Sequence, residues 1–169
     1  KANWNGEDAN PYETLPQLAM FTYQLSGMIR KQIERGMDLS DDNTVDYAFD
    51  LNEFFITDER GKFVHEEEIR KFLHTLTTQE RYPFSTHTMW YLNRVASAKA
   101  LERLLREDEV FSEYKVILAA GDGRIDDDDA QATKAFDQVK TAIANYDKTI
   151  TLTVGQLTVG VTIPEWSGV

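Results

Sequence analysis

Residues 149–169 read TITLTVGQLTVGVTIPEWSGV, and this stretch decides how the rest of the chain is interpreted. Apolar residues alternate with threonines over residues 149–154, which predicts a β-strand with its threonines on one face. Gly155 and Gly160 flank the turn that follows, and Pro164 closes the segment because proline cannot donate to a strand ladder. Open α/β sheets place their ligands in loops that follow such strands. We therefore expect a binding loop directly after this strand.

Upstream of this strand, from residue 86 onwards, short apolar runs alternate with amphipathic patterns. The apolar runs predict buried strands over 86–92 and 114–120, and helical spacing predicts helices over 97–107 and 129–146. Strand–helix–strand–helix–strand is the pattern of a parallel sheet with crossover helices. We therefore predict an α/β fold for residues 85–169.

The first half of the chain has a different pattern. Helical spacing predicts helices over residues 17–35 and 66–77, and residues 58–61 form a turn signal. The aromatic run over residues 47–56 is ambiguous between strand and helix. We expect residues 1–84 to form a mostly helical accessory region before the α/β part.

The composition bounds the class of protein. The chain has 169 residues, about one domain or one domain with an appendage, and 41% of them are hydrophobic, enough for a packed core. The formal net charge of −11 argues against a free-standing nucleic-acid binder, because phosphate contacts dominate such affinity. Cysteine is absent, and no apolar run approaches the roughly 18 residues that span a bilayer. We expect no membrane contact and a cytoplasmic location.

The stretch over residues 153–166 resembles motif V of superfamily-two helicases, in which a buried strand is followed by a small-residue turn, a glycine and a proline. Residues 86–92 resemble the motif IV strand of these enzymes, and residues 119–123 resemble the next strand end. The form TVGQLTVG followed by PEW is most similar to helicase-like subunits of restriction–modification systems, such as type III restriction enzymes. The resemblance implies a partial RecA-like sheet, the second RecA-like domain of such a subunit.

This resemblance also implies a function, a segment of an ATP-dependent DNA helicase or translocase that forms one wall of the cleft between two RecA-like domains. ATP and Mg are implied for the whole protein, with none expected in this segment. DNA, the remaining helicase domains and a modification subunit are the implied partners. Motif V contacts the DNA backbone and couples it to the nucleotide, which implies these roles for Thr153, Gly155, Gln156, Thr158, Gly160 and Thr162. Many relatives have Asp at the position of Thr162. A neutral hydroxyl replaces that carboxylate here, so the resemblance supports a nucleotide contact at Thr162 less than at the other positions.

Hydrolysis of ATP by this segment alone is not expected. The chain contains no Gly-x-x-x-x-Gly-Lys-Ser/Thr loop and no Asp-Glu-x-His motif, and the arginine-bearing motif VI of the family would follow residue 169. The first residue is Lys1 rather than Met, which indicates a segment of a longer protein. Missing later strands would leave a sheet edge exposed, so we predict possible self-association.

Two other patterns carry weaker signals. Residues 122–129, DGRIDDDD after Gly121, resemble the second half of a calcium loop. The first ligand positions of such a loop would fall on Leu118 and Ala120, which have no side-chain oxygen. The spacing of His65, His74 and His87 fits no metal motif. Two alternative functions remain open: a non-catalytic α/β domain that binds a protein partner, and a small-molecule-binding domain that uses the 155–160 loop.

Overall fold

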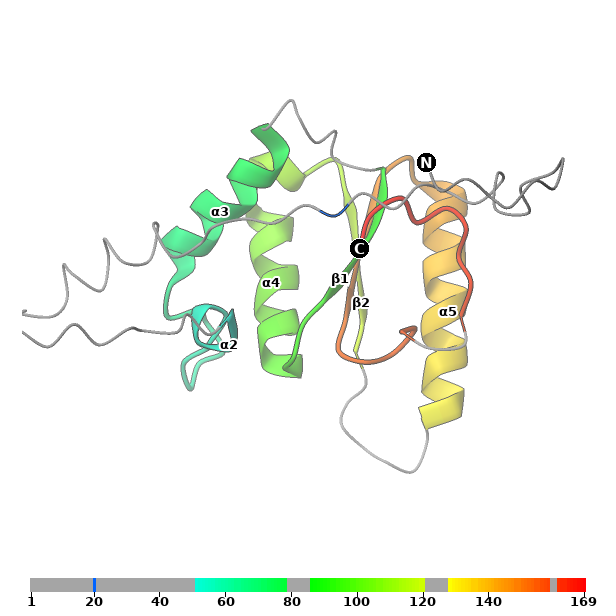
Figure 1. The fold of residues 1–169 in the computed structure, drawn as a ribbon, viewed down its shortest axis with the longest axis horizontal. Helices are drawn as coiled ribbons and strands as arrows, with labels where there is room; N and C mark the ends of the chain where they lie inside the picture. Colours follow the sequence, from blue (N-terminus) through cyan, green and yellow to red (C-terminus); the bar gives the residue numbers. More distant parts are fainter. Residues whose placement is uncertain (1–19, 21–50, 79–85, 121–127, 159–160) are drawn as a thin grey trace, which may run out of the picture. The chain divides into compact units, whose positions relative to one another are not determined.

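The computed structural model describes Met20 and residues 51–78, 86–120, 128–158 and 161–169. The chain forms two compact units, Lys1–Asp41 and Asp42–Val169, and the helices and strands described here belong to the second. Figure 1 shows their arrangement. In chain order they are α2 (Leu51–Phe54), α3 (Glu66–Thr78), β1 (His87–Tyr91), α4 (Val95–Glu107), the 3-10 helix η1 (Glu109–Phe111), β2 (Lys115–Ala119), α5 (Asp128–Asn145) and β3 (Thr149–Thr153).

The three strands form a parallel sheet in the order β1-β3-β2. This confirms the predicted α/β fold, and each of the five predicted elements from residue 86 onwards begins and ends within two residues of its prediction. The helix predicted over residues 66–77 is α3, and α2 resolves part of the ambiguous aromatic run as helix. The helix predicted over residues 17–35 lies outside the described residues, apart from Met20.

Strand β3 is buried on both of its faces. Ile150 and Leu152 are fully buried, and so are the three threonines that alternate with them, Thr149, Thr151 and Thr153. The threonines share one face of the strand, as predicted, and this face is buried. The reason is the position of the strand, because β3 lies between β1 and β2 and helices cover both faces of the sheet.

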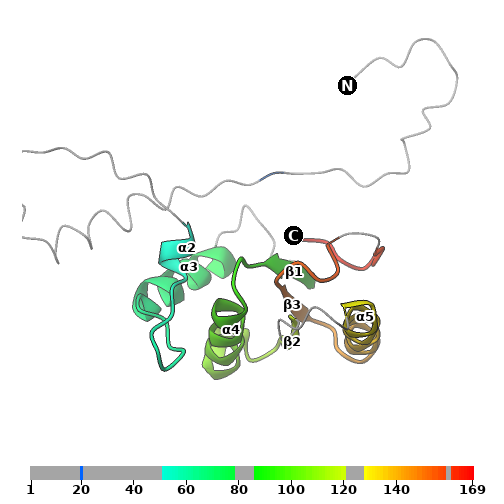
Figure 2. The ribbon, with the colours of Figure 1, turned by 90° about the horizontal axis from the view of Figure 1, so that it is seen from below.

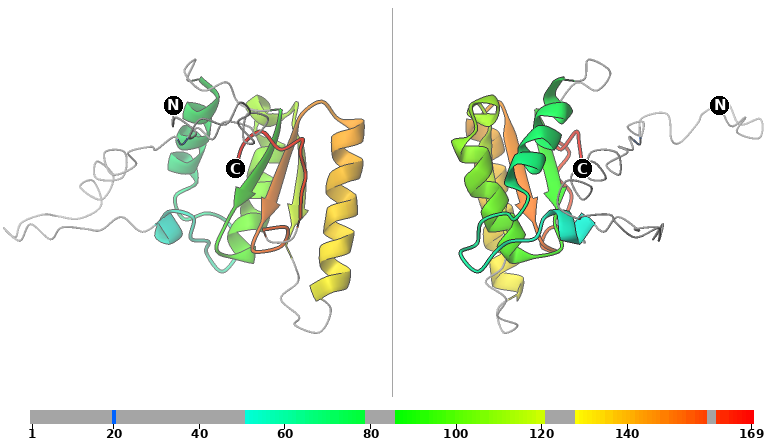
Figure 3. Two further views of the ribbon diagram at one scale, coloured as in Figure 1. Left: turned by 45° about the vertical axis from the view of Figure 1, so that its right-hand side comes forward. Right: turned by 90° about the vertical axis from the view of Figure 1, so that its left-hand side faces the viewer.

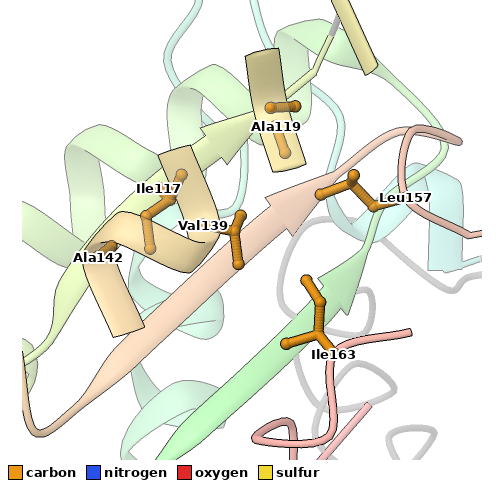
Figure 4. Close-up of a cluster of buried hydrophobic side chains, with 7 residues drawn as sticks. Ile117, Ala119, Val139, Ala142, Leu157 and Ile163 are labelled. Carbon is orange, nitrogen blue, oxygen red and sulfur yellow. The ribbon is translucent and has the colours of Figure 1, made fainter. Parts of the chain in front are cut away.

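Figure 2 shows α4 and α5 on opposite faces of the sheet. The α5 face holds a cluster of buried side chains in which Ile117 and Ala119 of β2 meet Val139 and Ala142 of α5 (Figure 4). Leu157 and Ile163, which follow β3, complete this cluster. Register places Thr151 beside Ile117, so the threonines of β3 point to the α5 face and the intervening Ile150 and Leu152 point to the α4 face.

Polar contacts link α3 to the end of α4. Asp108, at the C-cap of α4, accepts hydrogen bonds from Arg70 of α3 at 3.2 Å and lies 2.9 Å from Nε2 of His74. The Asp108 side chain also accepts from the backbone N–H of Val110 and so caps the start of η1. Burial raises the pKa of Asp108, but the hydrogen bonds from His74, Val110 and Arg70 outweigh this effect and hold the pKa below its ordinary value.

The segment between α2 and α3 is a tight turn, as predicted for residues 58–61. Gly61 N donates to the carbonyl of Asp58 at 2.9 Å, and the Asp58 carboxylate accepts from the backbone of Arg60 and Lys62. Arg103 of α4 donates to the Gly61 carbonyl, so the turn is tied to the helix beside it. The views in Figure 3 show α3 alongside α4 and the sheet. The division expected near residue 84 falls on residues outside the described ranges and stays a prediction.

The two outer strands of the sheet have different surroundings. Beside β1, the C-terminal segment runs parallel to the strand: Met89 N donates to the Gly168 carbonyl, and Ser167 N donates to the His87 carbonyl, both at 2.9 Å. On the other side, β2 pairs with β3 and with no other strand of the described residues. No helix within the described ranges is both long and apolar enough to cross a bilayer.

Candidate functional site

The candidate site lies where β1 and β3 end. The Leu92 N–H donates to the Thr153 carbonyl at 2.9 Å, so the two strands stay paired to their last residues. The chain that leaves β1 enters α4 on one face, whereas Leu157 and Ile163, after β3, pack in the cluster on the α5 face. Neighbouring strands whose connections leave to opposite faces create a crevice at their carboxyl ends, the place where open α/β sheets bind ligands. Figure 1 shows these strand ends and the start of α4 at the same edge of the sheet.

The loop after β3 has a specific backbone conformation. Gly155 and Leu157 both have positive φ angles, 95° and 63°, which favour glycine strongly over a branched residue such as leucine. Leu157 takes this conformation because its side chain is buried in the α5-face cluster. Among the described residues, apart from the two chain neighbours, no atom lies within 4 Å of the position of a β-carbon at Gly155, so glycine is needed there for its backbone angle and not for space.

Two threonine hydroxyls stabilise the loop from inside. Thr153 donates to the carbonyl of Gln156, and Thr158 donates to the carbonyl of Gly155 at 2.7 Å. Both bonds close short turns within the loop, so the hydroxyl hydrogens are used by the loop itself. The Gly155 backbone and the Thr158 side chain remain exposed, which leaves this side of the loop accessible to a ligand.

The N-terminus of α4 forms the other side of the crevice. Arg94 is the N-cap residue, has an extended backbone conformation, and makes no side-chain capping bond. The first helical bond runs from Ala98 N to the Arg94 carbonyl at 3.0 Å, so the preceding N–H groups lack helical acceptors. Arg94 is therefore the residue at the positive end of the helix dipole. Arg94 is exposed, and its side chain has no ion-pair or hydrogen-bond partner in the described part of the chain.

A small cavity of about 160 Å³ lies next to this helix start. Phe55, Leu92 and Leu101 supply apolar walls, and Asn93, Arg94 and Ser97 supply polar groups. Ser97 donates to the Phe55 carbonyl at 2.7 Å, which fixes the start of α4 to the segment after α2. At the mouth of the crevice Tyr91 is 58% exposed, unusual for a strand residue and suitable for contact with a planar ligand group.

The structure brings together some of the residues that the motif resemblance singled out. Gly155, Gln156 and Thr158 lie in the loop at the sheet edge, and Thr162 is exposed further along the chain. Thr153 is fully buried and its hydroxyl faces inward, so its part in the site is to hold the loop. Gly160 lies outside the described residues. The phosphate-binding and nucleotide-coupling roles of these residues stay predictions.

Arg94 is the residue that sequence reasoning missed. The helix was predicted to start at residue 97, whereas α4 starts at Val95, and arginine is not a residue that signals a helix N-terminus. The sequence Asn93-Arg94 directly after a buried strand was the available signal, because a charged residue between a strand and a helix in a parallel sheet lies at the ligand-binding edge.

The weaker motifs give no second site. Most of the 122–129 acidic run lies outside the described residues, and no group of three His, Cys, Asp or Glu side chains within the described ranges could hold a metal ion. The histidines lie apart: His74 contacts Asp108, and Nδ1 of His87 lies 3.1 Å from the Thr149 hydroxyl. His65 precedes α3 and is exposed.

Three comparisons, with protein-family models, with curated proteins and with solved structures, found no match to this chain. Its family is therefore not established by similarity, and the geometry of the sheet edge is the basis for a functional proposal.

Proposed function

We propose that the sheet edge formed by the 155–158 loop and the start of α4 binds the phosphate backbone of a nucleic acid. The observation that carries this proposal is the uncapped N-terminus of α4 with the unpaired Arg94 at its N-cap. Free backbone N–H groups, a helix dipole and a guanidinium are the groups that bind phosphate oxygens without reading bases. The loop adds an exposed glycine backbone at Gly155.

In its fuller form, the proposal is that the chain forms part of an ATP-dependent DNA helicase or translocase of the restriction–modification type. The parallel sheet with crossover helices is compatible with part of a RecA-like domain. The motif V resemblance falls on the loop that this sheet holds at its carboxyl edge. In such a motor, ATP and Mg would bind between this domain and a second one, and the loop would transmit DNA contact to that cleft.

The net charge of −11 restricts how such a contact works. A strongly acidic chain is repelled by DNA at long range, so attraction has to come from a few local groups at the edge. This makes Arg94 disproportionately important, because it is the cation next to the helix N-terminus. Binding should be weak and should fall only modestly with added salt, because few phosphates are neutralised.

The test is fluorescence anisotropy of a labelled DNA oligonucleotide titrated with the chain at low and moderate salt. Arg94→Glu should abolish most of the binding, while Lys99→Glu, the same charge change at an exposed site on the same helix, should leave most of it. Equal losses in the two variants would mean a nonspecific charge effect and would overturn the site. DNA-stimulated ATP hydrolysis by a motor containing this chain, abolished by Gly160→Asp, would support the fuller proposal.

A second candidate function is a non-catalytic α/β domain that binds a protein partner. The observation that favours it is the open outer edge of β2, which lies on the opposite side of the sheet from the covered β1 edge. The acidic net charge is also easier to reconcile with a protein partner than with DNA. Failure of both the wild-type chain and Lys99→Glu to bind DNA would favour this candidate.

A further inference from the structure

The outer edge of β2 forms the floor of a groove between α4 and α5. The groove has a volume of about 1100 Å³, and four successive β2 residues line it: Lys115, Val116, Ile117 and Leu118. Residues of α4 and α5 form its walls, and Figure 2 shows β2 at the edge of the sheet between these two helices.

The backbone of β2 presents unused hydrogen-bonding groups to this groove. Lys115 N donates to the Lys148 carbonyl, so the N–H and C=O of Lys115 point toward β3. Backbone groups alternate in direction along a strand, which directs those of Val116 and Leu118 away from β3 and into the groove. Neither residue has a backbone partner on that side among the described residues. Two donors and two acceptors are thus ready for an added strand.

The groove walls indicate what kind of strand fits. On the α5 side they carry a polar stripe at helical spacing, Lys134, Asp137, Gln138, Thr141 and Asn145. Lys115 belongs to the same face, and its ammonium lies 5.2 Å from the ring centroid of Tyr146 at the end of α5. On the α4 side, Arg106 pairs with Glu102 at 2.7 Å, which neutralises both charges there. Among the described residues that line the α5 side, Lys115 and Lys134 stand against one acid, Asp137, and leave this side positive.

We propose that this groove binds an extended acidic segment of a partner protein by strand addition to β2. The backbone of the segment would pair with Val116 and Leu118, and its carboxylates would face Lys115 and Lys134 on the α5 side. Its alternate, apolar side chains would face the α4 side, toward which Val116 and Leu118 also point. The segment therefore has an alternating acidic and apolar pattern.

The polar walls argue against a second copy of this chain as the occupant. A permanent sheet-to-sheet interface buries apolar side chains on both faces, whereas the α5 wall here is polar. A charged lysine on an edge strand is a feature that natural proteins use to prevent uncontrolled pairing of this kind.

The experiment uses a fluorescein-labelled peptide that alternates Glu and Val, titrated with the full chain and followed by anisotropy. Binding is expected, and a peptide that alternates Lys and Val should bind at least about tenfold more weakly because it faces Lys115 and Lys134. N-methylation of alternate residues of the Glu-Val peptide, on the edge that pairs with β2, should also weaken binding by about tenfold by removing backbone donors. Lys134→Glu should weaken it, whereas Lys71→Glu, an exposed change on α3, should not.

Hydrogen exchange of backbone amides distinguishes strand addition from a purely electrostatic contact, because only strand addition protects an amide of β2. The Leu118 amide should exchange more slowly once the Glu-Val peptide is bound, while the amide of exposed Lys99 should not be affected. Equal binding of the acidic and basic peptides, or an unchanged Leu118 amide, would overturn the proposal. If the chain without peptide self-associates and its Val116 and Leu118 amides are already protected, the proposal is overturned and a second copy of the chain occupies the groove. Because DNA binding is measured separately at Arg94, the two proposals can fail independently.

Discussion

The Thr153 hydroxyl, at the end of the central strand, donates a hydrogen bond to the backbone carbonyl of Gln156. This contact turns the chain sharply after β3 and directs Leu157 into the cluster on the α5 face. A threonine that appears in the sequence as a ligand-binding residue is therefore first a residue that shapes the loop. The loop depends on three features together: this bond, the positive φ of Gly155 and the burial of Leu157.

We expect Gly155→Ala to destabilise the loop by about 1–2 kcal/mol, because alanine does not readily adopt a φ of 95°. The cost is purely conformational, since among the described residues, apart from the two chain neighbours, no atom lies within 4 Å of the added methyl group. Gly155→Asn is the matched control and should cost less, because asparagine tolerates positive φ better than alanine. Urea unfolding of the three proteins measures the difference, and a neutral Gly155→Ala would contradict the conformational account.

Substitutions at Leu157 should reverse the usual ranking of alanine and glycine. In Leu157→Ala the backbone still has to adopt the positive φ of 63°, and the shorter side chain also leaves a cavity. We expect a total cost of about 2–4 kcal/mol in the free energy of unfolding. Leu157→Gly loses the same contacts but adopts the positive φ without strain, so it should be no less stable than Leu157→Ala. In ordinary positions glycine is the more destabilising of the two. Thermal unfolding of both variants tests the ranking, and a clearly less stable glycine variant would mean that the backbone at Leu157 is not strained.

Much of the α/β half could be predicted from local patterns. Short apolar runs and amphipathic helices from residue 86 onwards identified β1, α4, β2, α5 and β3, because their burial is strong enough to fix the type of element. The order β1-β3-β2 could not be predicted, because right-handed crossovers restrict the handedness of each connection but not the position of each strand. The central position of β3 is what buries the threonines.

Those buried threonines give a test of the packing. Thr149 has a partner for its hydroxyl, Nδ1 of His87 at 3.1 Å, whereas the buried hydroxyl of Thr151 has no hydrogen-bond partner in the described part of the chain. Thr151→Val should therefore stabilise the protein by about 1 kcal/mol, since an unsatisfied polar group is replaced by a methyl of similar size. Thr149→Val should be neutral or destabilising by up to about 1 kcal/mol. Equal effects of the two substitutions would contradict this assignment of partners.

The candidate site was only partly predictable for related reasons. The loop after β3 was identified because its glycines and threonines form a local pattern, and it does lie at the carboxyl edge of the sheet. The place of Arg94 in the site was not predicted. It depends on the start of α4 lying near the end of β3, and these two segments are far apart in the sequence. The β2 groove was invisible for the same reason, since its walls come from helices about 30 residues apart in the chain. Sequence patterns find elements, whereas sites depend on how elements meet.

The last prediction concerns acid stability and rests on Asp108, whose side chain is 5% exposed. Its pKa in the folded state lies below the ordinary value of 3.8, because the bonds from His74, Val110 and Arg70 outweigh the effect of burial. A carboxyl with a lowered folded-state pKa contributes stability above its unfolded-state pKa, and this contribution is lost as the pH falls through the folded-state value. The packing of α3 on α4 should therefore weaken below about pH 4.

Asp108→Asn isolates this contribution. At pH 7 it should lower the free energy of unfolding by about 1–3 kcal/mol, because asparagine can still accept from Val110 but cannot pair as an anion with Arg70 and His74. Since the variant has no carboxyl to protonate, the difference between the two proteins should shrink as the pH falls below 4. Urea unfolding from pH 7 to pH 3 measures this convergence, with Glu113→Gln as the control for a carboxyl in a surface ion pair. A constant difference across that range would mean that Asp108 stabilises α3 by hydrogen bonding alone and not by charge.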